Sequence, residues 1–129
     1  MHIIGNGVDI IKNSRINNSL KTKGFLNRIF TKKEIQQGTK LKNKINFYAK
    51  RFAAKEAFVK AIGTGFRSDI NFIDIEIKNY KNGKPYISLS KKLNNFLQKK
   101  FKIQKYKVFL SLSDEKDYSI AFVVIDKKI

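Results

Sequence analysis

The chain has 129 residues, of which 42% are hydrophobic and eleven are Phe, so it can bury one packed core and is not a disordered tail. No apolar run is long enough to cross a membrane, the start does not resemble a secretory signal, and the absence of Cys excludes disulfides and thiolate chemistry and fits the cytoplasm. The 28 Lys and Arg residues outnumber the 10 Asp and Glu residues, and the resulting net charge of +18 favours an anionic partner such as nucleic acid, an acidic protein or a polyphosphate cofactor.

The first third of the chain predicts a strand followed by short helices. Apolar residues over 3–11, interrupted by two glycines, indicate an opening strand. Residues 15–27 are basic with spaced apolar positions and predict one or two short helices. Thr31 and Glu34 have the spacing of a capping box, so another helix should begin there. A polar loop is expected over 38–44.

The remainder predicts one long helix and two hairpins. The helix should run from about 45 to 62, because glycines at 63 and 65 can adopt the left-handed conformation that ends helices. The other expected elements are a strand over 72–78, a tight turn at Asn82-Gly83, a strand over 84–89, a helix capped by Ser90, and strands over 106–113 and 118–125. This order predicts an α+β fold in a single domain, residues 1–129, with a mostly antiparallel sheet packed around the long helix.

The long helix carries a carboxylate, Glu56, on a face built of small apolar residues. Ala49, Ala53 and Ala57 recur with it at steps of three and four residues and therefore share that face. Burying an unpaired carboxylate costs several kcal/mol, so Glu56 needs a partner. Lys60 lies one turn later, and spacing alone favours an ordinary surface ion pair between the two.

A second acid, Asp9, interrupts the apolar half of the opening strand. It could cap a helix that begins after Ile11. Alternatively, Asp9 and Glu56 are the two carboxylates that Mg²⁺ needs when a substrate phosphate and waters complete its coordination. The turn Gly63-Thr64-Gly65 would suit phosphate oxygens, since its N–H groups can approach them closely.

Several short stretches together resemble those of one enzyme family. They are Gly7-Val-Asp-Ile10, the block RFAAKEAFVKAIGTG that begins at Arg51, and Asn82-Gly-Lys-Pro-Tyr86. In these stretches, and in their order along nearly the whole chain, the sequence resembles the holo-acyl-carrier-protein synthases, the small single-domain branch of the 4′-phosphopantetheinyl transferases. The resemblance implies the fold of that superfamily and a Mg²⁺-dependent reaction of fatty acid biosynthesis. In this reaction the 4′-phosphopantetheine arm of coenzyme A moves to a serine of apo-acyl carrier protein, and adenosine 3′,5′-bisphosphate leaves.

The same resemblance assigns roles to individual residues. Asp9 and Glu56 match the metal-binding acids, and Lys60 matches a catalytic lysine at the coenzyme A pyrophosphate. The residues at coenzyme A-binding positions are Arg51, Lys60, Gly63, Gly65, Asn82, Gly83, Lys84, Pro85 and Ser113. The residues at carrier-protein docking positions are Arg15, Lys21, Phe25, Arg28 and Ile29.

Acyl carrier proteins are acidic, so the implied partner matches the positive charge of the chain. Members of the family form homotrimers with active sites between neighbouring copies, and the resemblance implies the same here. A nucleic-acid binder would also explain the charge. However, its candidate stacking residues (Phe47, Tyr48, Phe52 and Phe58) have core-like helical spacings, and the sequence contains no nucleic-acid-binding motif.

Four acidic positions leave alternatives open. This chain has Asp114 where many members of the family carry a histidine. A cationic contact with a coenzyme A phosphate is therefore lost or supplied by another residue. The chain could also be an inactive relative that only binds carrier protein or coenzyme A. Asp74 and Glu76 should share a face of a strand, where pairing with lysines is favoured over metal binding. Glu34 is expected to act mainly as a helix cap.

Overall fold

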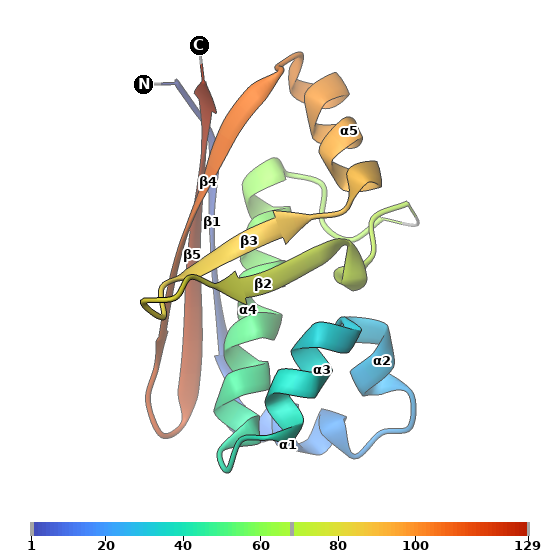
Figure 1. Ribbon diagram of the computed structural model, residues 1–129, viewed down its shortest axis with the longest axis vertical. Coiled ribbons are helices and arrows are strands. Elements are labelled where there is room, and N and C mark those ends of the chain that lie inside the picture. The colour runs from blue at the N-terminus through green and yellow to red at the C-terminus, as the bar shows by residue number, and fades with distance from the viewer. Residues whose placement is uncertain (1, 68, 129) are drawn as a thin grey trace.

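The computed structural model describes residues 2–67 and 69–128, and these residues form two antiparallel sheets and the helices shown in Figure 1. The helices are α1 (Asn13–Leu20), α2 (Phe25–Ile29), α3 (Lys32–Thr39), α4 (Lys44–Ile62), the 3₁₀ helix η1 (Phe72–Asp74) and α5 (Lys91–Phe101). The strands are β1 (His2–Lys12), β2 (Ile75–Asn79), β3 (Pro85–Leu89), β4 (Lys105–Asp114) and β5 (Tyr118–Lys128). The predicted antiparallel α+β fold around one long helix is confirmed, but the strands form two sheets where a single sheet was expected.

The larger sheet has the strand order β1-β5-β4, with α4 packed against one of its faces (Figure 1). Asp9 stands opposite Ala121 of β5 in this sheet. Ala49, Ala53 and Ala57 of α4 are fully buried, as is Ala121. Such small side chains let a helix lie close to a sheet, so the alanine face predicted from the sequence is the face that meets the strands.

The two glycines of the opening strand, Gly5 and Gly7, do not interrupt it, contrary to the prediction. β1 continues through both, with a register shift between Ile3 and Gly5. A Cβ atom on Gly5 would lie 2.0 Å from the carbonyl oxygen of Ala61, and one on Gly7 would lie 2.0 Å from that of Ala57. The glycines are therefore present because the α4 backbone touches the strand there.

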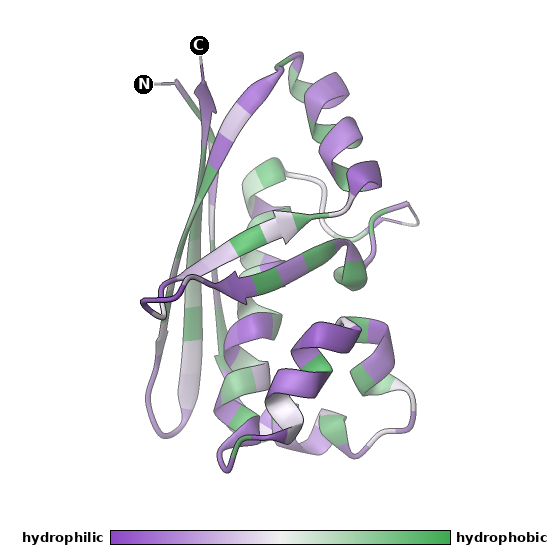
Figure 2. Cartoon of the chain, viewed as in Figure 1, coloured by the Kyte–Doolittle hydropathy of each residue, from purple (hydrophilic) through white to green (hydrophobic). Residues whose placement is uncertain are grey.

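Helix α4 begins and ends close to the predicted positions. Asn43 caps its N-terminus by accepting a hydrogen bond from the Asn46 N–H, and Gly63 ends it with a left-handed φ of 77°. Figure 2 shows hydrophobic residues along much of its length, and its buried residues include Phe58 and Val59 as well as the alanines. α4 therefore lies at the centre of the molecule, between the larger sheet and the β2–β3 hairpin (Figure 1).

The strand expected over 72–78 is shorter than predicted. Phe72–Asp74 forms a 3₁₀ turn, in which the Asp74 carboxylate accepts a hydrogen bond from the Asn71 N–H at 2.9 Å. Asp74 and Glu76 therefore do not share a strand face. Asp74 accepts hydrogen bonds from Ser90 and pairs with Lys92, whereas Glu76 accepts one from the Thr31 hydroxyl and pairs with Lys78. The favoured lysine pairing is confirmed for both acids.

The shorter helices lie at the two ends of the molecule. α1, α2 and α3 gather beside the first half of α4, and α5 lies at the opposite end, near the N- and C-terminal ends of the chain (Figure 1). Thr31 and Glu34 form the predicted capping box of α3, and the Ser90 hydroxyl caps α5 by accepting from the Leu93 N–H. In the part of the chain that the structure describes, no helix has the length and hydropathy needed to cross a membrane.

Candidate active site

Three side chains predicted to act together are neighbours in the structure. Asp9 projects from β1, and Glu56 and Lys60 project from successive turns of α4. The Lys60 ammonium donates to Asp9 Oδ1 at 3.0 Å and to the Val8 carbonyl oxygen at 3.1 Å. The ion pair that forms is thus between Lys60 and Asp9, in place of the helical pair with Glu56 that spacing alone favoured. Asp9 is also not a helix cap, because the residue at the N-cap of α1 is Lys12.

The two carboxylates are close enough to repel each other. Burial raises the pKa of Glu56, and the charge of Asp9 raises it further, while Lys60 opposes both effects. A cation placed between the acids would relieve this repulsion. The side chain of Asp9 is 15% exposed and that of Lys60 is 53% exposed, so the site is open to solvent and to a ligand.

The donors fit a hard divalent cation. Carboxylate oxygens are the ligands that Mg²⁺ prefers, and Mg²⁺ commonly takes only one or two carboxylates while keeping waters and substrate phosphates. Among the described residues, there is no cluster of three or more His, Cys, Asp or Glu that could hold a metal. A cation bound by Asp9 and Glu56 would therefore have most of its coordination positions free for water and phosphate oxygens.

Apart from Ser113, the predicted coenzyme A-binding residues fall into two groups. Gly63 and Gly65 lie just beyond the C-terminus of α4, one turn after Lys60, with left-handed φ values of 77° and 63°. Arg51 lies twelve residues before Gly63, which corresponds to about 18 Å along a helix. One group therefore lies at the C-terminal end of α4, one turn beyond Lys60, and the other lies near the N-terminal half of α4.

The second group links Arg51 to the β2–β3 turn. Arg51 Nη2 donates to Asn79 Oδ1 at 2.9 Å, and Asn79 Nδ2 donates to the Gly83 carbonyl oxygen at 2.9 Å. Arg51 is only 5% exposed, and its guanidinium lies 3.7 Å from the centre of the Phe47 ring. Burial lowers the pKa of Arg51 to about 10, so the group remains charged at neutral pH. The turn that it supports carries Asn82, Gly83 and Lys84, all exposed.

Ser113 and Asp114 end β4 on the rim of a hollow of about 540 Å³, which Ile10 and Ile120 also line. Asp114 accepts a hydrogen bond from Asn46 Nδ2 at 2.7 Å and lies 3.4 Å from the Lys50 ammonium. Its negative charge is therefore partly offset within the chain. This is a contact that the sequence did not predict.

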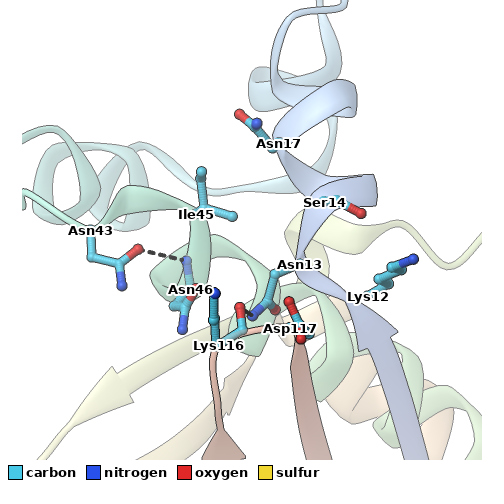
Figure 3. Close-up of a pocket in the computed structure, with 9 residues that line it drawn as sticks. All are labelled: Lys12, Asn13, Ser14, Asn17, Asn43, Ile45, Asn46, Lys116 and Asp117. Carbon is cyan, nitrogen blue, oxygen red and sulfur yellow. Dashed lines mark hydrogen bonds between the residues drawn. The ribbon is translucent and has the colours of Figure 1, made fainter.

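Figure 3 shows a smaller cleft, of about 220 Å³, beside the β4–β5 turn. Its walls are mostly amides and lysines, and the Asn13 amide is buried and donates to the carbonyl oxygens of Glu115 and Lys116. Asn46 also donates to the Glu115 carbonyl oxygen. Asn13 and Asn46 are therefore occupied in holding the turn. Neither Asp9 nor Glu56 lines this cleft, so it is separate from the candidate active site.

The predicted docking residues divide into exposed cations and buried apolar residues. Arg15, Lys21 and Arg28 are exposed, as their role requires. Phe25 is only 9% exposed and Ile29 only 3%. Their side chains pack inside this chain and hold α2 in place. They therefore do not form the apolar contact surface that the resemblance implied.

The sequence did not predict one buried ion pair. Lys55 and Glu34 are both completely buried, with the Lys55 ammonium 2.6 Å from Glu34 Oε1. Glu34 is therefore more than the helix cap that was expected. The only sequence signal was a lysine between Ala54 and Glu56 in a block otherwise rich in small apolar residues, and that signal does not reveal a partner twenty-one positions earlier.

Comparisons with known proteins identify the family of the chain. Residues 5–123 match the family described as the 4′-phosphopantetheinyl transferase superfamily. A holo-[acyl-carrier-protein] synthase of Pelagibacter ubique is 52% identical over 128 residues, which is 99% of this chain and 100% of the relative. The synthase of Bacillus anthracis, solved in complex with CoA (3′,5′-ADP), is 36% identical with a TM-score of 0.82 over 99% of this chain and 100% of that one.

The synthase structure from Neisseria meningitidis is 39% identical with a TM-score of 0.85, covering 97% of this chain and 99% of that one. In each comparison, the similarity in sequence and in fold spans nearly the whole length of both proteins. The matched residues include the strand and helix that carry Asp9, Glu56 and Lys60. The chain belongs to the 4′-phosphopantetheinyl transferase superfamily and, within it, to the holo-[acyl-carrier-protein] synthases.

Proposed function

We propose that this chain transfers the 4′-phosphopantetheine arm of coenzyme A to a serine of apo-acyl carrier protein and releases adenosine 3′,5′-bisphosphate. The observation that carries the proposal is the meeting of Asp9 and Glu56 beside Lys60, in an open site on a chain of this family. Phosphoryl transfer of this kind depends mainly on positioning and electrostatics. A cytoplasmic location is part of the proposal.

Asp9 and Glu56 are the residues that would hold Mg²⁺, whose charge offsets the negative charge of the pyrophosphate when the ion is bound. Lys60 would supply a second positive charge at the same place. Its ammonium is bonded to Asp9 and is half exposed, so it can turn from the carboxylate toward a phosphate oxygen. Gly63 and Gly65 are exposed, and among the described residues no heavy atom other than those of the chain neighbours lies within 4 Å of where a Cβ would stand on either glycine, which leaves room for a phosphate beside the turn.

Charge and exposure also support the proposed partner. Arg15, Lys21 and Arg28 present three exposed cations on and between α1 and α2. An acidic carrier protein would be attracted to this surface, and such charges mainly raise the rate of association.

A homotrimer with active sites between copies is the assembly we propose. The face of the β1-β5-β4 sheet that α4 does not cover exposes a group of apolar side chains: Val8, Ile10, Phe109, Ile120 and Phe122. Val8 stands opposite Phe122 and Ile10 opposite Ile120, so the group is contiguous. Contact between copies would bury this surface. It could also bring the acids of one copy toward the Arg51 and β2–β3 turn group of another.

A transfer assay tests the proposed reaction directly. Apo-carrier protein is incubated with the enzyme, coenzyme A and Mg²⁺ and then weighed by mass spectrometry. The proposal predicts a gain of one phosphopantetheine arm per carrier protein and no gain when EDTA removes the metal. Binding of carrier protein or coenzyme A without any mass gain would indicate an inactive binding module. Salt-sensitive retention of RNA or DNA with no coenzyme A binding would indicate the nucleic-acid alternative.

A further inference from the structure

The completely buried pair of Lys55 and Glu34 joins four separate parts of the chain. The Lys55 ammonium donates to the Ile29 carbonyl oxygen at 2.7 Å and to Glu34 Oε1 at 2.6 Å. Glu34 also accepts hydrogen bonds from the Thr31 N–H and, on its other oxygen, from the Ile77 N–H, both at 2.9 Å. The network therefore ties α2, α3 and β2 to α4.

The bond from Lys55 to Ile29 has a specific place in the proposed reaction. Ile29 is the last residue of α2 and follows the exposed docking residue Arg28, whereas Lys55 precedes the metal-binding residue Glu56. One hydrogen bond thus connects the backbone that carries the docking cation to the helix that carries the catalytic acid. The last carbonyls of a helix lack partners within the helix, and a cation is favourable at that end.

Stability alone does not explain such a pair. Two charges must lose their hydration to be buried, and well-packed apolar side chains in their place are often equally stable or more stable. What an apolar pair cannot do is fix a particular carbonyl group at a particular distance. α2 has only five residues and is too short to hold its own orientation.

We propose that Lys55 and Glu34 are positioning residues that fix Arg28 relative to Glu56, so that a carrier protein docked on α2 presents its serine to the active site. This inference rests on the proposed function, because it takes Arg28 as a docking residue. Lys55 and Glu34 are fully enclosed and touch neither substrate, so their effect passes through α2.

A double-mutant cycle tests the inference. The variant Glu34→Gln/Lys55→Met removes both charges, so that no unpaired charge is left buried, and it is combined with Arg28→Ala. The expected result is a rise of about tenfold in KM for apo-carrier protein when Arg28 is present. In the Arg28→Ala background the further rise should be less than about twofold, because the residue being positioned is gone. KM for coenzyme A should stay within about twofold in every variant.

Other outcomes overturn the inference. An equal rise in KM for carrier protein with and without the Arg28→Ala substitution would mean that the pair does not act through Arg28. A kcat that falls by the same factor with and without the Arg28→Ala substitution, with both KM values unchanged, would mean that the pair only keeps the protein folded. The exposed pair Arg67→Met/Asp69→Asn, whose atoms Nε and Oδ1 lie 3.5 Å apart, is the matched control and should leave KM for carrier protein unchanged.

Two additions keep the test decisive. If the double variant does not fold, Lys55→Arg retains the charge but is longer, so it should displace α2 and give the same non-additive result with Arg28→Ala.

Calorimetric Kd values for apo-carrier protein are measured across the same cycle. A wild-type protein that binds the carrier protein without transferring the arm would refute the proposed reaction, and the Kd cycle would still decide the positioning role. A wild-type protein that does not bind it would refute the positioning role as well.

Discussion

At the residue scale, the candidate site holds two acids in an arrangement that lowers the stability of the fold. Asp9 and Glu56 are held close together although their charges repel, and burial adds to the cost at Glu56. Active sites commonly carry such unfavourable arrangements because a ligand relieves them. The sequence indicated both acids, since each interrupts an apolar pattern. It did not reveal that Lys60 would pair with Asp9, because that contact joins residues fifty-one positions apart.

Replacing one acid should therefore stabilise the metal-free protein. We expect Glu56→Gln to melt at a higher temperature than the wild type in EDTA, because the substitution removes a repelled and partly buried charge. Addition of Mg²⁺ should narrow or reverse the difference, since only the wild type gains from binding the cation through both acids. Thermal melts with and without Mg²⁺ provide the measurement. A lower melting temperature for Glu56→Gln in EDTA would show that the two carboxylates do not strain the fold.

Asp74 gives a pH-dependent prediction away from the site. Burial alone would raise the pKa of Asp74, but hydrogen bonds from Asn71 and Ser90 and the Lys92 ammonium outweigh it and hold the pKa below its usual value. Because the folded-state pKa is the lower one, this stabilisation is present above the unfolded-state pKa and is lost as pH falls through the folded-state pKa.

Asp74→Asn should accordingly cost about 1–2 kcal/mol of unfolding free energy at pH 7 and less at about pH 3, which lies below the unfolded-state pKa of an aspartate. Urea melts at both pH values test this. The exposed acid Asp69, changed to Asn, is the control. A deficit in Asp74→Asn that is the same at both pH values would rule out the charge as its source.

At the element scale, helix boundaries were predictable and strand details were less so. The capping box at Thr31 and the glycine at the end of α4 are local signals, and both helix ends were found where expected. Phe72 to Lys78 alternates as a strand does, yet its first three residues form a 3₁₀ turn because Asp74 bonds back to Asn71. In the sequence, the two glycines of β1 look like breaks in a strand. Their role depends on the close approach of the α4 backbone, and the sequence does not show that α4 lies beside them.

The contact between β1 and α4 leads to a sharp prediction. Gly7→Ala places a Cβ atom 2.0 Å from the Ala57 carbonyl oxygen and 2.7 Å from the Ala61 nitrogen. Both neighbours are backbone atoms and cannot move aside cheaply, so we expect a loss of about 3 kcal/mol or more in unfolding free energy. Transfer activity should fall as well, because α4 must move away from Asp9. Urea melts measure the loss, and Asn6→Ala, at an exposed position of the same strand, is the control. Equal stability of the two variants would contradict the close contact between β1 and α4.

At the scale of the whole molecule, the uncovered apolar face of the larger sheet predicts association. A single Phe122→Glu substitution places a charge in the middle of the group that includes Val8 and Ile120. If the sheet faces meet in a trimer, this variant should have the mass of a monomer by light scattering and lose most of its transfer activity. Lys91→Glu, an exposed position on α5 outside this sheet, should remain trimeric. A wild-type protein that is a monomer at assay concentrations would refute the proposed assembly.

Whole-molecule properties also show what the sequence could not decide. The charge of +18 indicated an anionic partner without choosing among its classes, and only the family resemblance and the exposed cations near α2 favour a carrier protein. The apolar docking residues expected on α2 are buried, since Phe25 and Ile29 complete the core around that short helix. Residue identities could be carried over from relatives, whereas the exposure of a side chain depends on packing that the sequence does not state.

The most direct test of the central claim compares carrier-protein modification by three variants at saturating coenzyme A and Mg²⁺. Asp9→Asn and Glu56→Gln should each lower the rate of mass gain by at least about 100-fold while retaining a cooperative unfolding transition, because each removes one of the two proposed metal ligands. Asp126→Asn, an acid at the far end of the same sheet, should react at the wild-type rate. Undiminished transfer by either Asp9→Asn or Glu56→Gln would contradict the assignment of these two acids as a shared metal site.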